Sequence, residues 1–146
     1  MTVTNNAAWE QPGFRVGQFE ANADYSAQTP TDEPTFSFTG VVLVAATGAG
    51  VLGPFALQVA SSAGVPIVGI MQNNPQVAEA ADVVTFGVSK AQAGAAVSTI
   101  GTILAVNSSG LFVPATSGQY GVAMALQTAA GSGTIFSVYV DNYGKQ

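Results

Sequence analysis

The chain has 146 residues, about one domain, with three basic and eight acidic side chains and a net charge of −5. It contains no histidine and no cysteine, which excludes disulfides, thiolate chemistry and Cys/His zinc sites and favours a protein that is not an enzyme. The only cations, Arg15, Lys90 and Lys145, are dispersed, so neither nucleic acid nor an anionic membrane surface is an expected partner.

The first 35 residues carry five of the eight acids and show no sustained period of 3.6 or 2. We expect an extended N-terminal arm here, with one short strand over residues 14–20. Its aromatic residues are Trp9, Phe14, Phe19 and Tyr25. Aromatic side chains on a polar, poorly periodic segment indicate docking. The surface they dock on is either another protein or the chain's own domain.

A β-branched and aromatic run over residues 36–44 predicts a strand, and it leads into a Gly-x-Gly-x-x-Gly sequence at 48–53. In a dinucleotide-binding unit that loop joins a strand to a helix, and an acidic residue follows about 20 positions later. Here the corresponding position is occupied by Gln72 and asparagines, and the next carboxylate is Glu79. Because the chain has 17 glycines, a structural loop is favoured, and a nucleotide-binding α/β fragment is kept as an alternative.

The middle of the chain combines short apolar runs with two possible helices. Residues 65–71 predict a second strand, and short helices are expected over 55–62 and 74–81, where proline can occupy a first turn. Residues 83–90 alternate, which predicts a strand with Val84, Phe86 and Val88 on one face. A membrane span over 41–60 is disfavoured by its glycines and proline and by the lack of flanking cations.

The last third of the chain has the pattern of β-hairpins. Apolar runs at 103–106 and 111–113 flank turn-forming residues 107–110, which predicts a hairpin. Residues 121–127 place Val122, Met124 and Leu126 on one face at period 2, and 134–140 are β-branched and aromatic. Short strands at near-regular spacing, broken by turns, predict a small barrel or sandwich.

Two further polar features of the sequence are candidate sites. Asn73, Asn74, Glu79 and Asp82 lie close enough in sequence to surround a calcium ion, but no Asp-x-Asp-x-Asp-Gly loop is present, and a solvated turn is favoured. Lys90 is flanked by uncharged residues. It is expected to rest its stem on apolar surface and keep its ammonium group in water, rather than to be a buried catalytic amine.

Three segments, 65–75, 83–94 and 100–110 with the runs that follow it, resemble the capsid-cement (head-decoration) proteins of tailed bacteriophages in glycine spacing and small-residue texture. The resemblance covers roughly residues 35–140. It implies a mainly β protein, with a small β-barrel or β-tulip-like domain and short helices over 36–146 and an extended arm over 1–35.

The resemblance also implies a function. Such proteins assemble as homotrimers on the outer surface of an icosahedral shell, bind the major capsid protein and have no catalytic residues and no cofactor. The implied location is the virion, after synthesis in the host cytoplasm. The residues expected to contact the capsid are Trp9, Phe14, Phe19 and Tyr25. A surface or carbohydrate-binding β module is the other alternative, although the single tryptophan and dispersed tyrosines offer no obvious aromatic platform.

Overall fold

The computed structural model describes residues 14–15, 19–23, 25, 36–48, 50–51 and 54–146. Within these residues every regular element is a strand, in agreement with the predicted mainly β class. The strands are β1 (Phe14–Arg15), β2 (Phe19–Glu20), β3 (Gly40–Ala45), β4 (Phe55–Val59), β5 (Gly69–Met71), β6 (Ala80–Ala81), β7 (Val83–Gln92), β8 (Ile103–Val106), β9 (Phe112–Pro114), β10 (Tyr120–Ala125) and β11 (Ile135–Lys145).

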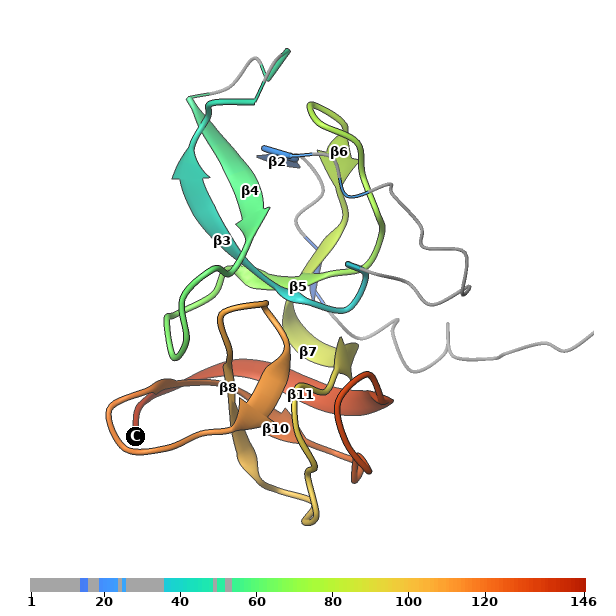
Figure 1. Cartoon of the computed structure of the whole chain (residues 1–146), viewed down its shortest axis with the longest axis vertical. Coiled ribbons are helices and arrows are strands. Elements are labelled where there is room, and N and C mark those ends of the chain that lie inside the picture. Colours follow the sequence, from blue (N-terminus) through green and yellow to red (C-terminus); the bar gives the residue numbers. More distant parts are fainter. Residues whose placement is uncertain (1–13, 16–18, 24, 26–35, 49, 52–53) are drawn as a thin grey trace, which may run out of the picture.

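One curled antiparallel sheet runs in the order β4-β3-β5-β7-β11-β10-β8-β9, and β2 and β6 form a second, two-stranded sheet. Figure 1 shows two lobes joined by β7. We call β2 to β6 with the start of β7 the upper lobe, and β8 to β11 with the rest of β7 the lower lobe. The long strand β7 belongs to both because residues 83–84 pair with β5 and residues 87–92 pair with β11.

The lower lobe curls until its last strand meets the strand that began it. Phe112 of β9 forms a parallel bridge with Ala93, directly after β7, and the Phe112 carbonyl accepts the N–H of Gly94 at an N···O distance of 2.7 Å. Leu104, Val138 and Phe112 are completely buried inside this curl or nearly so. The arrangement is barrel-like, as the strand spacing predicts.

The upper lobe is closed by residues from the N-terminal segment. β2 pairs with β6, and Ala21 forms a parallel bridge with Leu57 of β4. Ala21 and Tyr25 thereby join a second core cluster with Leu57, Met71 and other residues of the upper lobe. The described residues of the predicted arm thus pack on the chain's own sheet.

The two predicted helices are wrong. Residues 55–59 form β4, and its register with β3 pairs Ala45 with Phe55 and Val41 with Val59. Residues 74–81 form turns and the short strand β6. At residues 74–75, asparagine and proline begin a turn, which they do as readily as they begin a helix. At residues 55–59, pairing with β3 and burial of Leu57 outweigh the local preference for a helix. In the part of the chain that the structure describes, no helix is long and apolar enough to cross a membrane.

The predicted strand at residues 83–90 is present, but its predicted face is wrong. Val84 is completely buried, whereas Phe86 is 47% exposed. Gly87 adopts a φ of +96°, which interrupts the regular alternation, and the side chains buried after it are Ser89 and Ala91. The strand β7 contributes side chains to the cores of both lobes, so no single face of the strand is buried along its whole length.

The strands predicted in the last third are present, but Val122 does not share a face with Met124 as predicted, because it is buried in the core together with Ala123. The hairpin of β8 and β9 forms with Ala105 opposite Val113, and Asn107 closes its turn by accepting two backbone N–H groups, those of Ser109 and Leu111. β10 is a strand whose Ala123 lies in the core. The opposite face, with Met124, is partly exposed.

Candidate functional site

The arm residues predicted to bind a capsid are found in three different situations. β1 pairs with β7 through Phe14 opposite Phe86, and β2 pairs with β6 through Phe19 opposite Ala81. Trp9 lies outside the described residues. Contact of these residues with a capsid stays a prediction.

Tyr25, the fourth of these residues, lies in the core of the upper lobe. It is 7% exposed, and its ring centroid is 5.2 Å from that of Phe36 at an interplanar angle of 58°. Its phenolic oxygen accepts the N–H of Val59 at 3.1 Å. Burial raises the pKa of the phenol above its ordinary value of 10.0, and the hydrogen bond from Val59 partly offsets this. The structure thus gives Tyr25 a packing role within its own chain.

Asn22 anchors the N-terminal segment to the glycine loop. Its Oδ1 accepts the N–H groups of Thr47 at 2.8 Å and Gly48 at 2.9 Å, and its Nδ2 donates to the Thr47 hydroxyl at 3.1 Å. A Cβ at Gly48 would approach the Asn22 carbonyl oxygen to 2.6 Å, so this contact requires glycine. No pattern in the sequence singles out Asn22.

The same loop connects antiparallel strands. β3 enters it and β4 leaves it, with the Ala46 N–H bonded to the Pro54 carbonyl. A dinucleotide loop needs a helix after the last glycine, and a strand stands there instead. The Gly48 N–H, which a phosphate would need, is already donated to Asn22. The structural interpretation of the glycine motif is therefore correct.

The candidate calcium ligands form hydrogen bonds within their own loop. Asn73 accepts the Asp82 N–H at 2.9 Å and donates to the Ala80 carbonyl at 3.0 Å, and Glu79 accepts the Gln76 N–H at 2.9 Å. No group of three or more acidic, histidine or cysteine side chains suited to a metal ion occurs among the residues that are described.

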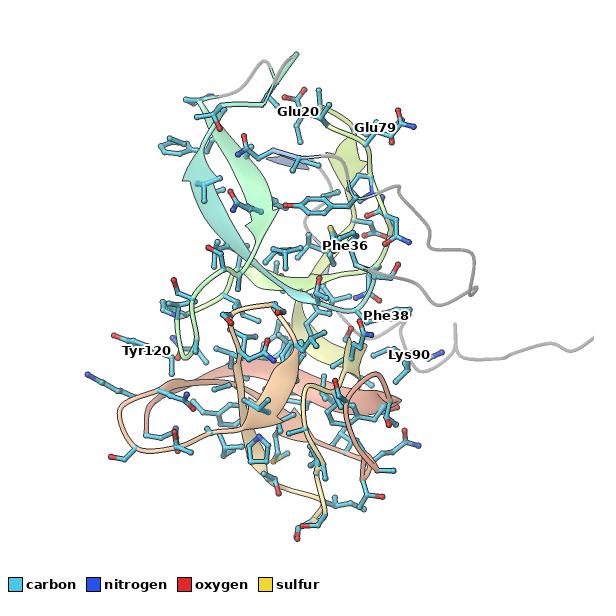
Figure 2. The ribbon with its side chains drawn as sticks, viewed as in Figure 1. Glu20, Phe36, Phe38, Glu79, Lys90 and Tyr120 are labelled. Atoms are coloured by element: carbon cyan, nitrogen blue, oxygen red, sulfur yellow. The ribbon has the colours of Figure 1, made fainter. Side chains whose placement is uncertain are left out.

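Lys90 lies at the junction of the lobes on β7, with its Nζ 5.8 Å from the centroid of the Phe38 ring (Figure 2). The side chain is partly exposed. This cation–π geometry matches the predicted amphipathic role, with the stem on apolar surface. Phe38 itself has a φ of +66°, and its backbone joins both lobes by donating to Met71 and accepting from Gln92.

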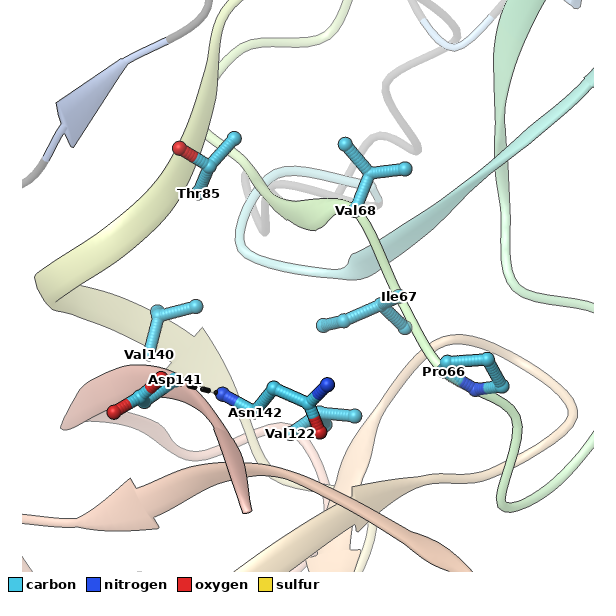
Figure 3. A pocket seen from close by; sticks show the side chains of 8 residues that line it. All are labelled: Pro66, Ile67, Val68, Thr85, Val122, Val140, Asp141 and Asn142. Atoms are coloured by element: carbon cyan, nitrogen blue, oxygen red, sulfur yellow. Dashed lines mark hydrogen bonds between the residues drawn. The ribbon is translucent and has the colours of Figure 1, made fainter. Parts of the chain in front are cut away.

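A small cavity of about 80 Å³ lies between the lobes (Figure 3). Ile67 and Val68 line it from the upper lobe, and Val140, Asp141 and Asn142 line it from β11. The register of β10 and β11 shifts here, which indicates a bulge. The Asp141 carboxylate accepts the N–H of Asn142 at 2.7 Å. The polar interruption of an apolar run at 141–142 was the only sequence signal for this bulge, and the sequence prediction missed it.

No protein-family model matches this sequence, and the comparison with curated proteins also gives no match. A solved structure does resemble the fold. The N base of the head fiber protein gp8.5 of bacteriophage phi29 superposes with a TM-score of 0.65 at 11% sequence identity, and the alignment covers 91% of this chain and 98% of that one. At this identity the likeness shows a shared fold.

Proposed function

We propose that this chain is a structural protein of a phage virion that binds the outer surface of an icosahedral capsid as a trimer and cements neighbouring capsomers. The observation that carries the proposal is the fold shared over nearly the full length of both chains with a protein of a phage head. It agrees with the resemblance of the sequence to capsid-cement proteins.

The chemistry of the chain supports a binding role over catalysis. The sequence has no histidine or cysteine. The polar side chains Asn22, Asn73 and Glu79 bind backbone groups of their own fold. We therefore propose that the protein is not an enzyme and acts without a cofactor, with the major capsid protein as its partner.

Cementing follows from mass action. A protein that binds only the assembled shell stabilises that shell, and three equivalent contacts on one trimer raise the effective concentration of the second and third contacts. Weak individual contacts then suffice, and the symmetry of a trimer can match that of its site.

We place the capsid contacts in the N-terminal arm. Trp9, Phe14 and Phe19 are the proposed anchors, because aromatic side chains dominate interface energetics. Tyr25 is left out of this set because its ring is buried against Phe36.

The proposal is tested by adding the purified protein to capsids of the same phage assembled without it. We expect co-sedimentation at a saturating stoichiometry and a higher melting temperature of the shell. Trp9→Ala should weaken binding about 30-fold, the equivalent of about 2 kcal/mol for one anchor. Trp9→Phe, which keeps an aromatic ring, is the matched control and should retain most of the affinity. Absence of co-sedimentation for the native chain contradicts the proposal.

A further inference from the structure

The outer face of the lower lobe carries an unbroken row of apolar side chains. The registers place Val88 of β7 opposite Tyr139 of β11, Tyr139 opposite Met124 of β10, and Met124 opposite Ile103 of β8. We call these four residues the outer row. All four are partly exposed. They lie on the side of their strands opposite to the core, since their neighbours Leu104, Ala123 and Val138 are buried.

An aromatic pair extends the row at its β7 end. Phe86 is 47% exposed, and its ring meets that of Tyr139 edge-on, with centroids 5.5 Å apart and an interplanar angle of 75°. Phe86 belongs to the same strand as Val88, two residues earlier. The apolar surface thus spans four strands and includes two aromatic rings and a methionine, the residue types enriched in protein interfaces.

The next row on the same face is different. There Lys90 stands opposite Ser137, and the Leu126 N–H bonds to the Ser137 carbonyl. A solvated face of an antiparallel sheet is ordinarily polar. The second row has this mixed character and the outer row does not, so the apolar character is confined to one band. Bands of this kind mark interaction sites.

The distribution of charge indicates what covers the band. The chain carries a net charge of −5, so copies repel one another through most approaches. Residues 91–140 contain no charged side chain, and the charges on the strands of the band are Lys90 of β7 and Asp141 and Lys145 of β11, so the surroundings of the band do not share the negative net charge of the chain. Figure 2 shows Glu20 and Glu79 at the end of the upper lobe that points away from the lower lobe. Two copies that meet through the outer row keep these carboxylates apart.

We infer that the outer row is the surface through which copies of this chain contact one another. The occupant is a second copy, and burial of Met124 and Tyr139 supplies the apolar area of the contact. The inference deepens the proposed function, because it names the face that assembles the oligomer. It can fail while the proposed binding to a capsid stands.

The test uses the full chain alone. Sedimentation velocity at micromolar concentration should show an oligomer of the native chain, and Met124→Glu, which places a charge in the centre of the row, should raise the dissociation constant at least 10-fold. Leu43→Glu is the matched control. This variant also replaces an apolar side chain by a carboxylate, but at a residue of β3 in the upper lobe that is 43% exposed. It should leave the oligomer intact.

Because the chain has no cysteine, single thiols report on burial directly. Met124→Cys should react with a maleimide more slowly at high than at low protein concentration, and Leu43→Cys should react equally fast at both. Ile103→Glu, a second charge in the row, replaces Met124→Glu if circular dichroism shows that variant to be unfolded.

A monomeric native chain at every concentration, or equal dissociation by the Met124→Glu and Leu43→Glu variants, overturns the inference. So does a Met124→Glu variant that stays oligomeric but no longer binds shells, because the row would then face the capsid. Conversely, an oligomer dissociated only by charges in the row, in a chain that binds no shell, supports this inference and contradicts the proposed function.

Discussion

Gly69 of β5 lies against the backbone carbonyl of Val84 in β7, so closely that a Cβ at residue 69 would overlap the carbonyl oxygen. This is the crossing at which the upper lobe meets the strand shared by both lobes. A backbone atom cannot turn aside as a side chain can, so the crossing requires glycine.

We therefore expect Gly69→Ala to lower the free energy of unfolding by about 1–3 kcal/mol, the usual cost of overpacking. Gly131→Ala is the control, because a Cβ there would meet no atom within 4 Å, and it should change stability by less than about 0.5 kcal/mol. Urea unfolding of the two variants provides the measurement, and equal midpoints would show that the strands do not approach this closely.

Ala78 should gain stability when it is replaced by glycine. Its φ of +65° lies in the left-handed region, which costs an L-residue about 1–2 kcal/mol, whereas glycine adopts it freely. Glycine also loses more conformational entropy on folding than alanine does, and this cost offsets part of the gain. The net effect of Ala78→Gly should be a stabilisation of about 0.5–1 kcal/mol. Ala80→Gly, in the strand β6, should destabilise it instead. Thermal unfolding measures both, and the same sign for the two variants contradicts the prediction.

Tyr25 should make stability depend on pH in the alkaline range. Burial raises the pKa of its phenol in the folded state above 10.0, so folding favours the protonated form. Its contribution is complete below pH 10 and is lost as the pH rises through the folded-state pKa. Tyr25→Phe should lose the hydrogen bond with the Val59 N–H, which lowers the free energy of unfolding by about 1 kcal/mol near neutral pH. Above pH 10 the free energy of unfolding should fall less steeply in this variant than in the native chain.

Urea unfolding between pH 8 and 11 measures this dependence. Tyr120→Phe, at a tyrosine that is 37% exposed, is the control and should follow the native curve. An alkaline slope identical in the native and Tyr25→Phe chains would contradict the assignment to Tyr25.

Removal of residues 1–25 should destabilise the upper lobe. The deletion takes Ala21 and Tyr25 out of the core and removes the Asn22 bonds to residues 47–48. We expect a lower melting temperature than for a chain that lacks only residues 1–13. Equal melting temperatures would instead support the boundary at residue 35 expected from the sequence, with 36–146 as an independent domain.

The sequence predictions succeeded where the structure of a segment depends on residues close to it in the sequence. The turn at Asn107 was predictable because its side chain bonds within its own turn, and the strand at 120–125 because period 2 is a property of neighbouring residues. The helix predicted at 55–62 failed because β4 is determined by pairing with β3, across a loop.

The closure of the upper lobe by N-terminal residues could not be predicted from the sequence, for a different reason. Residues 19–22 pair with strands about 35 to 60 positions away, and a two-residue strand such as β2 is too short to show a period. The outer row was also hidden, since its four residues come from four strands and become neighbours only through the register. The sequence predicts that Tyr25 docks on a surface, but it does not show which one. In the structure Tyr25 packs in the core of its own upper lobe.

Imaging of purified virus particles made with and without this chain tests the central claim most directly. The account predicts additional density at regular positions on the outer surface of the shell, of a size that fits the two-lobed fold, in the particles that contain the chain. Identical shells in the two preparations, with the chain absent from the purified particles, would contradict it.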